Sequence, residues 1–305
     1  MLNIQKFNCR TSVLLAAFAS AVTLSFNSTA APLLSLNAQN QIGIFDSATP
    51  GTVTYKTVTG LSAGESLLSI DLRPSNNQVY GVSTLNKLYT LNANSGSANF
   101  VADLSTSVYN SAAPSAIDID FNPVADRGTG ASLRVVSAAG ANYAVNAGTG
   151  AVTVATSIAA GNSGVAYTNS DTSQPATAPA STQLYYLNVQ GDQLFVANTA
   201  FNTPTLSLVG NFGIDVASLS AVEILSSGAA FAAATINTAS GLRSALFSVN
   251  LASGALSQIG LFADSVSSLS STPAAVPAPA TLALMLGAIS IAGLGSRLRR
   301  RSDAI

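Results

Sequence analysis

The feature that most constrains the fold is a short motif that recurs about every 50 residues. In three copies, at 88–97, 143–151 and 246–255, an alternating apolar segment leads into an asparagine and a turn with Ser/Thr-Gly. Looser copies lie at 44–51 and 194–204. The turns are marked by Gly51, Gly96, Gly150, Pro204 and Gly254, at intervals of 45, 54, 54 and 50 residues. Glycine supplies the positive φ that tight hairpins need, so each copy predicts a β-hairpin.

A second repeated element precedes the later hairpins. The paired segments are 69–72 with 79–82, 118–121 with 133–136, 165–167 with 184–187, and 222–225 with 230–233. Each unit therefore offers four short strands in about 50 residues, which is typical of a propeller blade. No segment has a convincing helical period. The pattern predicts an all-β, β-propeller-like domain over residues 31–271 with five four-stranded blades.

The first and last copies are incomplete in complementary ways. The first begins near 33–36 without an opening strand, and the last is followed by 265–269, which resembles one. We expect this C-terminal strand to complete the first blade and hide the sheet edges. An open or two-sheet β fold with the same hairpins is the alternative. Residues 168–182 indicate a loop insertion, and 272–279 a linker that contains a Val-Pro-Ala-Pro motif.

The N-terminus has the pattern of a cleavable signal peptide over residues 1–30. Lys6 and Arg10 precede a mostly apolar segment at 11–26, and small residues favour cleavage between Ala30 and Ala31. The only cysteine, Cys9, lies before the apolar segment and would leave with the signal peptide.

The C-terminus combines a proline motif, an apolar segment at 280–296 that predicts a transmembrane helix, and a basic cytoplasmic tail at 297–305. It resembles the PEP-CTERM sorting signal of Gram-negative bacteria, although Ala278 stands where glutamate is usual. The residues that carry the resemblance are Val276, Pro277, Pro279, Arg297, Arg299, Arg300 and Arg301. The resemblance implies handling by the export machinery, an inner-membrane intermediate, processing by an exosortase-like protease, and association with extracellular polysaccharide. A plain membrane anchor is the alternative.

Composition removes several chemistries. The chain has no histidine, and the segment after the signal peptide has no cysteine, so histidine- or cysteine-based catalysis and metal ligation are excluded. Between residues 31 and 275 there are six basic and twelve acidic residues, a net charge of −6. Such a surface argues against nucleic-acid binding.

Carboxylates remain as candidate functional groups, namely Asp71, Asp118, Asp120 and Glu223. Asp118 and Asp120 share one face of a strand, opposite Ile119, and the other two hold corresponding places in other blades. If these strands line a channel, the carboxylates could bind Ca²⁺ through oxygen or act as a glycosidase acid/base pair. Alternatively, they are solvated or paired with Arg73, Arg127 and Arg134.

Residues 119–127, Ile-Asp-Phe-Asn-Pro-Val-Ala-Asp-Arg, followed by Leu-Arg-Val-Val-Ser at 133–137, resemble the DUF4394 family. The motif is interrupted here at 128–132, which lengthens one hairpin loop. The resemblance covers most of 33–262 and implies a propeller-like exported domain with no activity to carry over.

Two functions fit these observations. The first is an exported, non-catalytic protein of the cell surface or extracellular matrix, associated with polysaccharide. The second is a secreted carboxylate-dependent glycan hydrolase or lyase.

Overall fold

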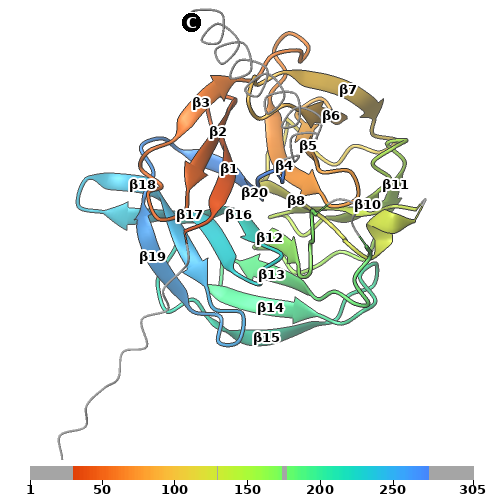
Figure 1. The fold of residues 1–305 in the computed structure, drawn as a ribbon. Helices are drawn as coiled ribbons and strands as arrows, with labels where there is room; N and C mark the ends of the chain where they lie inside the picture. Colours follow the sequence, from red (N-terminus) through yellow and green to blue (C-terminus); the bar gives the residue numbers. More distant parts are fainter. Residues whose placement is uncertain (1–29, 129, 174–176, 275–305) are drawn as a thin grey trace, which may run out of the picture.

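Five antiparallel sheets of four strands are arranged like blades around a central axis (Figure 1). The computed structural model describes residues 30–128, 130–173 and 177–274. Within these ranges there is no α-helix, and one turn of 3₁₀ helix, η1 (Ala125–Arg127), lies between β8 and β9. The five-bladed propeller predicted from the repeats is confirmed, and the open or two-sheet alternative is wrong.

Each blade is ordered from the axis outward. Blade 1 contains β20 (Val266–Ser271), β1 (Pro32–Asn37), β2 (Gln41–Asp46) and β3 (Thr54–Thr57). Blade 2 contains β4 (Leu67–Arg73), β5 (Gln78–Ser83), β6 (Lys87–Leu91) and β7 (Ala98–Asp103). Blade 3 contains β8 (Ile117–Phe121), β9 (Leu133–Ser137), β10 (Asn142–Val145) and β11 (Val152–Val154). Blade 4 contains β12 (Asn162–Tyr167), β13 (Leu184–Asn188), β14 (Gln193–Ala197) and β15 (Leu206–Asn211). Blade 5 contains β16 (Ser218–Ile224), β17 (Ala230–Thr238), β18 (Gly241–Val249) and β19 (Leu256–Leu261).

The ring is closed by the C-terminal strand, as the sequence predicts. β20 pairs with β1 in an antiparallel register that places Leu34 opposite Ser270. The innermost strands β20, β4, β8, β12 and β16 then contact one another in that order around the axis, and β16 returns to β20. Closure leaves no innermost strand without a neighbouring blade on each side.

The hydrophobic core is divided among the five junctions between blades. Alternating residues point from each sheet toward its two neighbours, and five clusters of buried side chains result, one for each junction. The cluster between blades 3 and 4 is the smallest in the described part of the chain, with five buried residues. This junction therefore has the least buried apolar packing of the five in the described residues.

The repeated turns follow the chemistry expected from the sequence, and the asparagine before each Ser/Thr-Gly turn accepts hydrogen bonds within it. In the β6–β7 turn, Gly96 has φ +79°, and an added Cβ would lie 2.3 Å from the Thr57 carbonyl oxygen of blade 1. The side chain of Asn92 accepts hydrogen bonds from the backbone N–H groups of Asn94 and Ser95, 2.9 and 3.1 Å away. Such an asparagine turn recurs at Asn146 and Asn250.

Two loops also match their predictions. The chain between β8 and β9 is lengthened by the residues at 128–132, and the connection from β12 to β13 spans 168–183. Each loop includes residues outside the described ranges.

The predicted sorting elements are mostly beyond the described residues. The signal peptide, the proline motif, the apolar segment and the arginine cluster lie in 1–29 and 275–305. Of the predicted cleavage residues, Ala30 is exposed, and the backbone of Ala31 bonds to both the side chain and the backbone of Ser47. In the described ranges no helix has the length and apolar character needed to cross a membrane.

Candidate functional site

The four candidate carboxylates all lie on innermost strands. Asp71 is on β4, Asp118 and Asp120 are on β8, and Glu223 is on β16. On β8, Asp118 and Asp120 alternate with apolar residues whose side chains are buried in the junction with blade 2, namely Ile117, Ile119 and Phe121. The period of two in a strand therefore directs these acids away from the apolar core.

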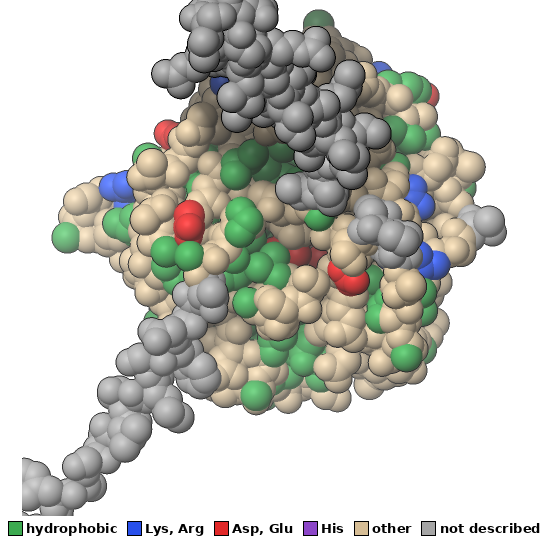
Figure 2. Space-filling view, in the orientation of Figure 1, with side chains coloured by type: hydrophobic (Ala, Val, Ile, Leu, Met, Phe, Trp, Pro, Cys, Tyr) green, Lys and Arg blue, Asp and Glu red, His purple; other side chains and the backbone are tan. Residues whose placement is uncertain are grey.

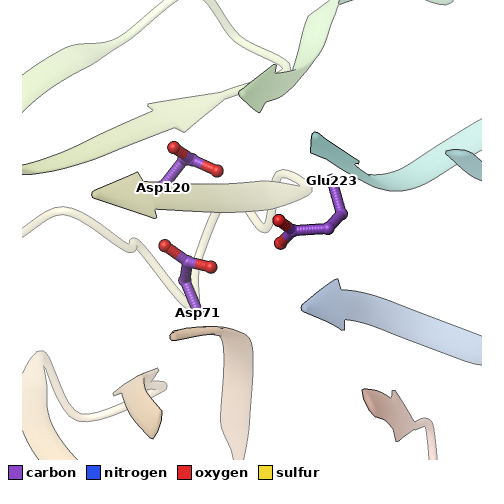
Figure 3. Close-up of side chains that lie close together, drawn as sticks. All are labelled: Asp71, Asp120 and Glu223. Atoms are coloured by element: carbon purple, nitrogen blue, oxygen red, sulfur yellow. The ribbon is translucent and has the colours of Figure 1, made fainter. Parts of the chain in front are cut away.

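Three of these carboxylates meet across the channel. Each of Asp71, Asp120 and Glu223 offers an oxygen, and the three oxygens lie within 4.8 Å of one another. Figure 3 shows the three groups converging from separate strands. Their side chains are 4%, 3% and 2% exposed. We call Asp71, Asp120 and Glu223 the channel carboxylates; Asp118, 1% exposed, lies two residues before Asp120 on the same strand.

The acids connect adjacent blades through backbone groups. Asp71 accepts a hydrogen bond from the N–H of Phe121 at 2.8 Å, and Asp120 accepts one from the N–H of Tyr167 at 3.0 Å. Glu223 accepts one from the backbone of Ser271. An innermost strand has one edge without a β partner, so its N–H groups need acceptors from elsewhere. The carboxylates of the neighbouring blade supply them.

Asp118 extends this pattern across the channel. Its Oδ2 accepts from the N–H of Val165 at 3.0 Å and from that of Val222 at 3.3 Å, and its Oδ1 accepts from the hydroxyl of Ser69 at 3.1 Å. Asp118 thus joins β4, β8, β12 and β16, whereas the channel carboxylates meet nearer the ends of their strands.

Serines of the channel have the same role and were missed in the sequence. Ser268 Oγ accepts from the N–H of Ile70 at 3.0 Å and shares a hydrogen bond with Ser69, also 3.0 Å. Ser270 donates to Asp71 at 3.3 Å. The only available signal was the alternation of serine in the C-terminal strand, which is weak because serine is abundant throughout the chain.

None of the four acids is solvated or paired with an arginine, so that alternative is wrong. The one ion pair in the described ranges joins Arg73 Nε to Asp126 Oδ1 at 2.7 Å. Asp126 also accepts from the backbone of Ser75 at 2.8 Å and from the hydroxyl of Ser132 at 2.9 Å. This pair holds blade 2 against η1 and is separate from the channel.

Burial without a counter-ion raises the pKa values of the four acids strongly. Loss of water raises the pKa of Asp71 to about 7 and that of Asp118 to about 8. Burial, and then the charge of Asp71, raises the pKa of both Asp120 and Glu223 well above the usual range. Such shifts are expected where like charges share a water-poor site.

One oxygen of the cluster has no partner. Among the described residues nothing donates a hydrogen bond to Glu223 Oε2, although the atom is fully buried. A buried polar atom without a partner costs about 1–3 kcal/mol. The spacing suits a hard cation, because two oxygens that bind one Ca²⁺ at about 2.3–2.6 Å lie within roughly 5 Å of each other. The three carboxylates therefore fit an oxygen-ligated divalent ion.

The two ends of the channel differ. Figure 2 shows acidic side chains in the hollow at the centre of one face, with lysines and arginines only toward its periphery. A cavity of about 410 Å³ is lined by the residues at which β4, β8, β16 and β20 begin, together with loop residues such as Tyr109. It contains no charged side chain. The channel carboxylates lie toward the other ends of these strands.

These features define a closed five-bladed β-propeller with an acidic cluster across its channel. The chain belongs to the family described as a domain of unknown function, DUF4394, whose model matches residues 41–270. The propeller architecture that the resemblance implied is thereby confirmed.

Other comparisons add no function. No curated protein matches the chain. Solved structures similar to it include regucalcin, a calcium-binding protein from Agrobacterium tumefaciens, with 16% identity and a TM-score of 0.39 over 73% of this chain and 67% of that one. A protein of unknown function from Bacteroides thetaiotaomicron has 11% identity and a TM-score of 0.45, covering 66% and 53%. YCF48 bound to D1 peptide has 9% identity and a TM-score of 0.36, covering 74% and 64%.

Proposed function

We propose that this chain is an exported, non-catalytic propeller of the cell surface or extracellular matrix, whose channel carboxylates bind Ca²⁺. The observation that carries the proposal is the convergence of three buried carboxylates from three blades with no basic counter-ion in the described structure and with Glu223 Oε2 unpartnered. An ion at this point would offset most of the negative charge of the cluster and cross-link blades 2, 3 and 5. Its role would be structural.

The number of carboxylate oxygens in the cluster supports a role in binding Ca²⁺. Three carboxylates offer six oxygens, and Ca²⁺ takes 6–8, with water completing the set. Binding requires ionised carboxylates, so the raised pKa values mean that affinity grows with pH. Ca²⁺ is accordingly expected to stabilise the protein at pH 8 far more than at pH 5.

The arrangement favours a structural role over a glycan hydrolase or lyase. Catalytic carboxyl pairs flank a bound sugar and are about 5–5.5 Å or 6.5–9.5 Å apart. The channel carboxylates lie within 4.8 Å and are at most 4% exposed, so a sugar ring has no space between them. Asp71 and Asp120 also hold backbone N–H groups of the next blade, a task that fixes their positions.

Calorimetric titration tests the ion site. The exported protein, purified from cells that express the full-length chain and stripped with EDTA, is titrated with CaCl₂ at pH 8 and at pH 5. We expect binding of one ion and a rise in melting temperature at pH 8, both strongly reduced at pH 5. Absence of heat and of a thermal shift at pH 8 would eliminate the ion site.

The sorting proposal has a separate test. We propose that the export machinery and an exosortase-like protease deliver the protein through an inner-membrane intermediate to the surface or matrix of a Gram-negative cell, where it associates with polysaccharide. Replacement of Arg299, Arg300 and Arg301 by glutamine should then change retention or processing, as measured by fractionation and immunoblotting. A full-length protein that stays in the inner membrane with its tail intact would support a plain anchor instead.

The hydrolase alternative is tested on the same preparation. Release of reducing ends or unsaturated sugars from extracellular polysaccharide, lost in the Asp120→Asn variant, would replace the non-catalytic proposal.

A further inference from the structure

A second cavity lies between blades 3 and 4, outside the channel. It encloses about 260 Å³, and its wall includes Arg134 and Tyr167 as well as Phe201 and Asn202, from the loop between β14 and β15. This is the junction with the smallest apolar cluster. The cavity and the polar contacts therefore replace apolar packing that the other junctions have.

Arg134 is a buried cation at this cavity, with 5% of its surface exposed. Its Nη1 donates to Asn142 Oδ1 at 3.0 Å and to the Tyr143 carbonyl at 3.4 Å. Its Nε donates to the Tyr167 hydroxyl at 3.3 Å, and its Nη2 donates to Asn202 Oδ1 at 3.0 Å. All four acceptors are neutral, and the only ion pair in the described ranges involves another arginine.

The guanidinium is held in place, but not all of its N–H donors have acceptors in the described structure. It has five N–H groups, and the four contacts leave at least one Nη2 N–H without an acceptor in the described structure. Burying a positive charge without a negative partner is costly. Because Arg134 is fixed by both blades, its charge is presented to the cavity in one orientation. A carboxylate is the complementary group, because it carries negative charge and one of its oxygens can accept from the free Nη2 N–H.

The rest of the wall suits a sugar. Asn122, Ser132 and Thr199 provide amide and hydroxyl groups, and Phe201 packs edge-on against Tyr167 with ring centroids 5.2 Å apart. An aromatic ring next to polar groups complements a sugar, which has apolar C–H faces and a hydroxyl edge. The volume is below the roughly 300–1,000 Å³ of sites for drug-sized ligands, which limits the occupant to about one ring.

We propose that this cavity binds a uronic acid residue of an acidic polysaccharide, with the sugar carboxylate on Arg134. The inference rests on the proposed matrix role in one respect, since it names the chemical class of the polysaccharide. Its site is separate from that of the ion, although Tyr167 contacts both, through its N–H to Asp120 and its hydroxyl to Arg134.

Binding is tested by calorimetry with trigalacturonate, a neutral glucose trisaccharide and succinate. We expect the wild-type protein to bind trigalacturonate and to bind the other two at least 10-fold more weakly. Arg134→Lys keeps the charge but loses the free Nη2 N–H and the contacts that fix its direction, and should weaken binding at least 10-fold. Arg243→Lys, at an arginine far along the sequence in blade 5, is the matched control and should leave binding unchanged.

A second variant guards against misfolding at the buried arginine. Thr199 is exposed at the cavity wall, so Thr199→Phe should fill the cavity, abolish trigalacturonate binding and leave the melting temperature within about 1 °C. Equal binding of succinate, or unchanged trigalacturonate binding in both Arg134→Lys and Thr199→Phe, would overturn the inference. Retention of native polysaccharide by a wild-type protein that does not bind trigalacturonate would also overturn it while leaving the matrix proposal standing.

Discussion

The Glu223→Gln variant tests whether repulsion among the channel carboxylates destabilises the metal-free protein. Glutamine keeps the length of the side chain and the oxygen that accepts from Ser271, and it replaces the unpartnered Oε2 with an NH₂ donor. That donor faces the oxygens of Asp71 and Asp120. The variant therefore removes one charge from the cluster and adds hydrogen-bond donors where only acceptors were present.

The expected gain follows from Coulomb's law. Two like charges 4.8 Å apart repel by about 3.5 kcal/mol at an effective dielectric constant of 20. At pH 8 without a metal ion this value is the upper limit of the gain, because the raised pKa of Glu223 keeps part of the population protonated and uncharged. For a domain of this size 1 kcal/mol shifts the melting temperature by about 2–4 °C, so we expect a rise of at most about 7–14 °C in EDTA.

Calcium narrows the difference between the two proteins. A site filled at 100 times its dissociation constant adds about 2.7 kcal/mol to the wild-type protein, whereas Glu223→Gln should gain little because one ligand is lost. Melting is followed by circular dichroism at pH 8 and pH 4.5 with EDTA or CaCl₂. At pH 4.5 the advantage in EDTA should shrink, because the carboxylates of the folded cluster, whose pKa values are raised, are then protonated and no longer repel one another.

The control is Asp103→Asn at an exposed carboxylate on β7. It should leave both the melting temperature and the effect of Ca²⁺ unchanged. The reasoning is refuted if Glu223→Gln is less stable than wild type in EDTA at pH 8, or if Ca²⁺ stabilises both proteins equally.

Three further predictions concern pH and the fold. The pKa of Asp71 is raised to about 7 from 3.8, so the folded state keeps a proton that the unfolded state releases. The free energy of unfolding of the metal-free protein should therefore fall by several kcal/mol between pH 4 and pH 8. Stability that rises over this range in EDTA melts would contradict the shift. Gly96→Ala should cost more than Gly64→Ala, because both glycines have positive φ but only the former would bring its Cβ within 2.3 Å of a backbone oxygen; equal costs in urea unfolding would remove the close approach as a factor. Asp126→Asn should lower the free energy of unfolding by about 3–5 kcal/mol in the same assay by leaving Arg73 without its counter-charge, and a loss below about 1 kcal/mol would mean that the pair contributes little.

Much of the architecture was readable in the sequence because it depends on local rules. Alternation, an asparagine and a Ser/Thr-Gly turn specify each outer hairpin, and the missing opening strand of the first repeat predicted closure by β20. The position of a turn glycine against the preceding blade, as at Gly96, was not readable. It depends on the distance between blades, which no single repeat contains.

The sequence identified the acidic residues of the candidate site, but it did not identify which groups they contact. Asp71, Asp120 and Glu223 were selected because they occupy corresponding places in the repeats, and the structure brings them together. Arg134 was expected to pair with such acids and instead lies in a cavity at the next junction. The register between innermost strands decides which side chains meet, and that register is a property of the closed ring.

Closure by β20 has a consequence for the order of folding. β1 is made first, and its partner is among the last residues of the domain, so the blade 1 pairing spans more than 200 residues. A contact so distant in the chain must wait for synthesis and, in an exported protein, for translocation of the C-terminal strand. Until then β1 presents an open edge that can pair with other chains. The nascent domain would therefore depend on chaperones until the ring closes, and shortening the chain before residue 266 should yield aggregation rather than a four-bladed remnant.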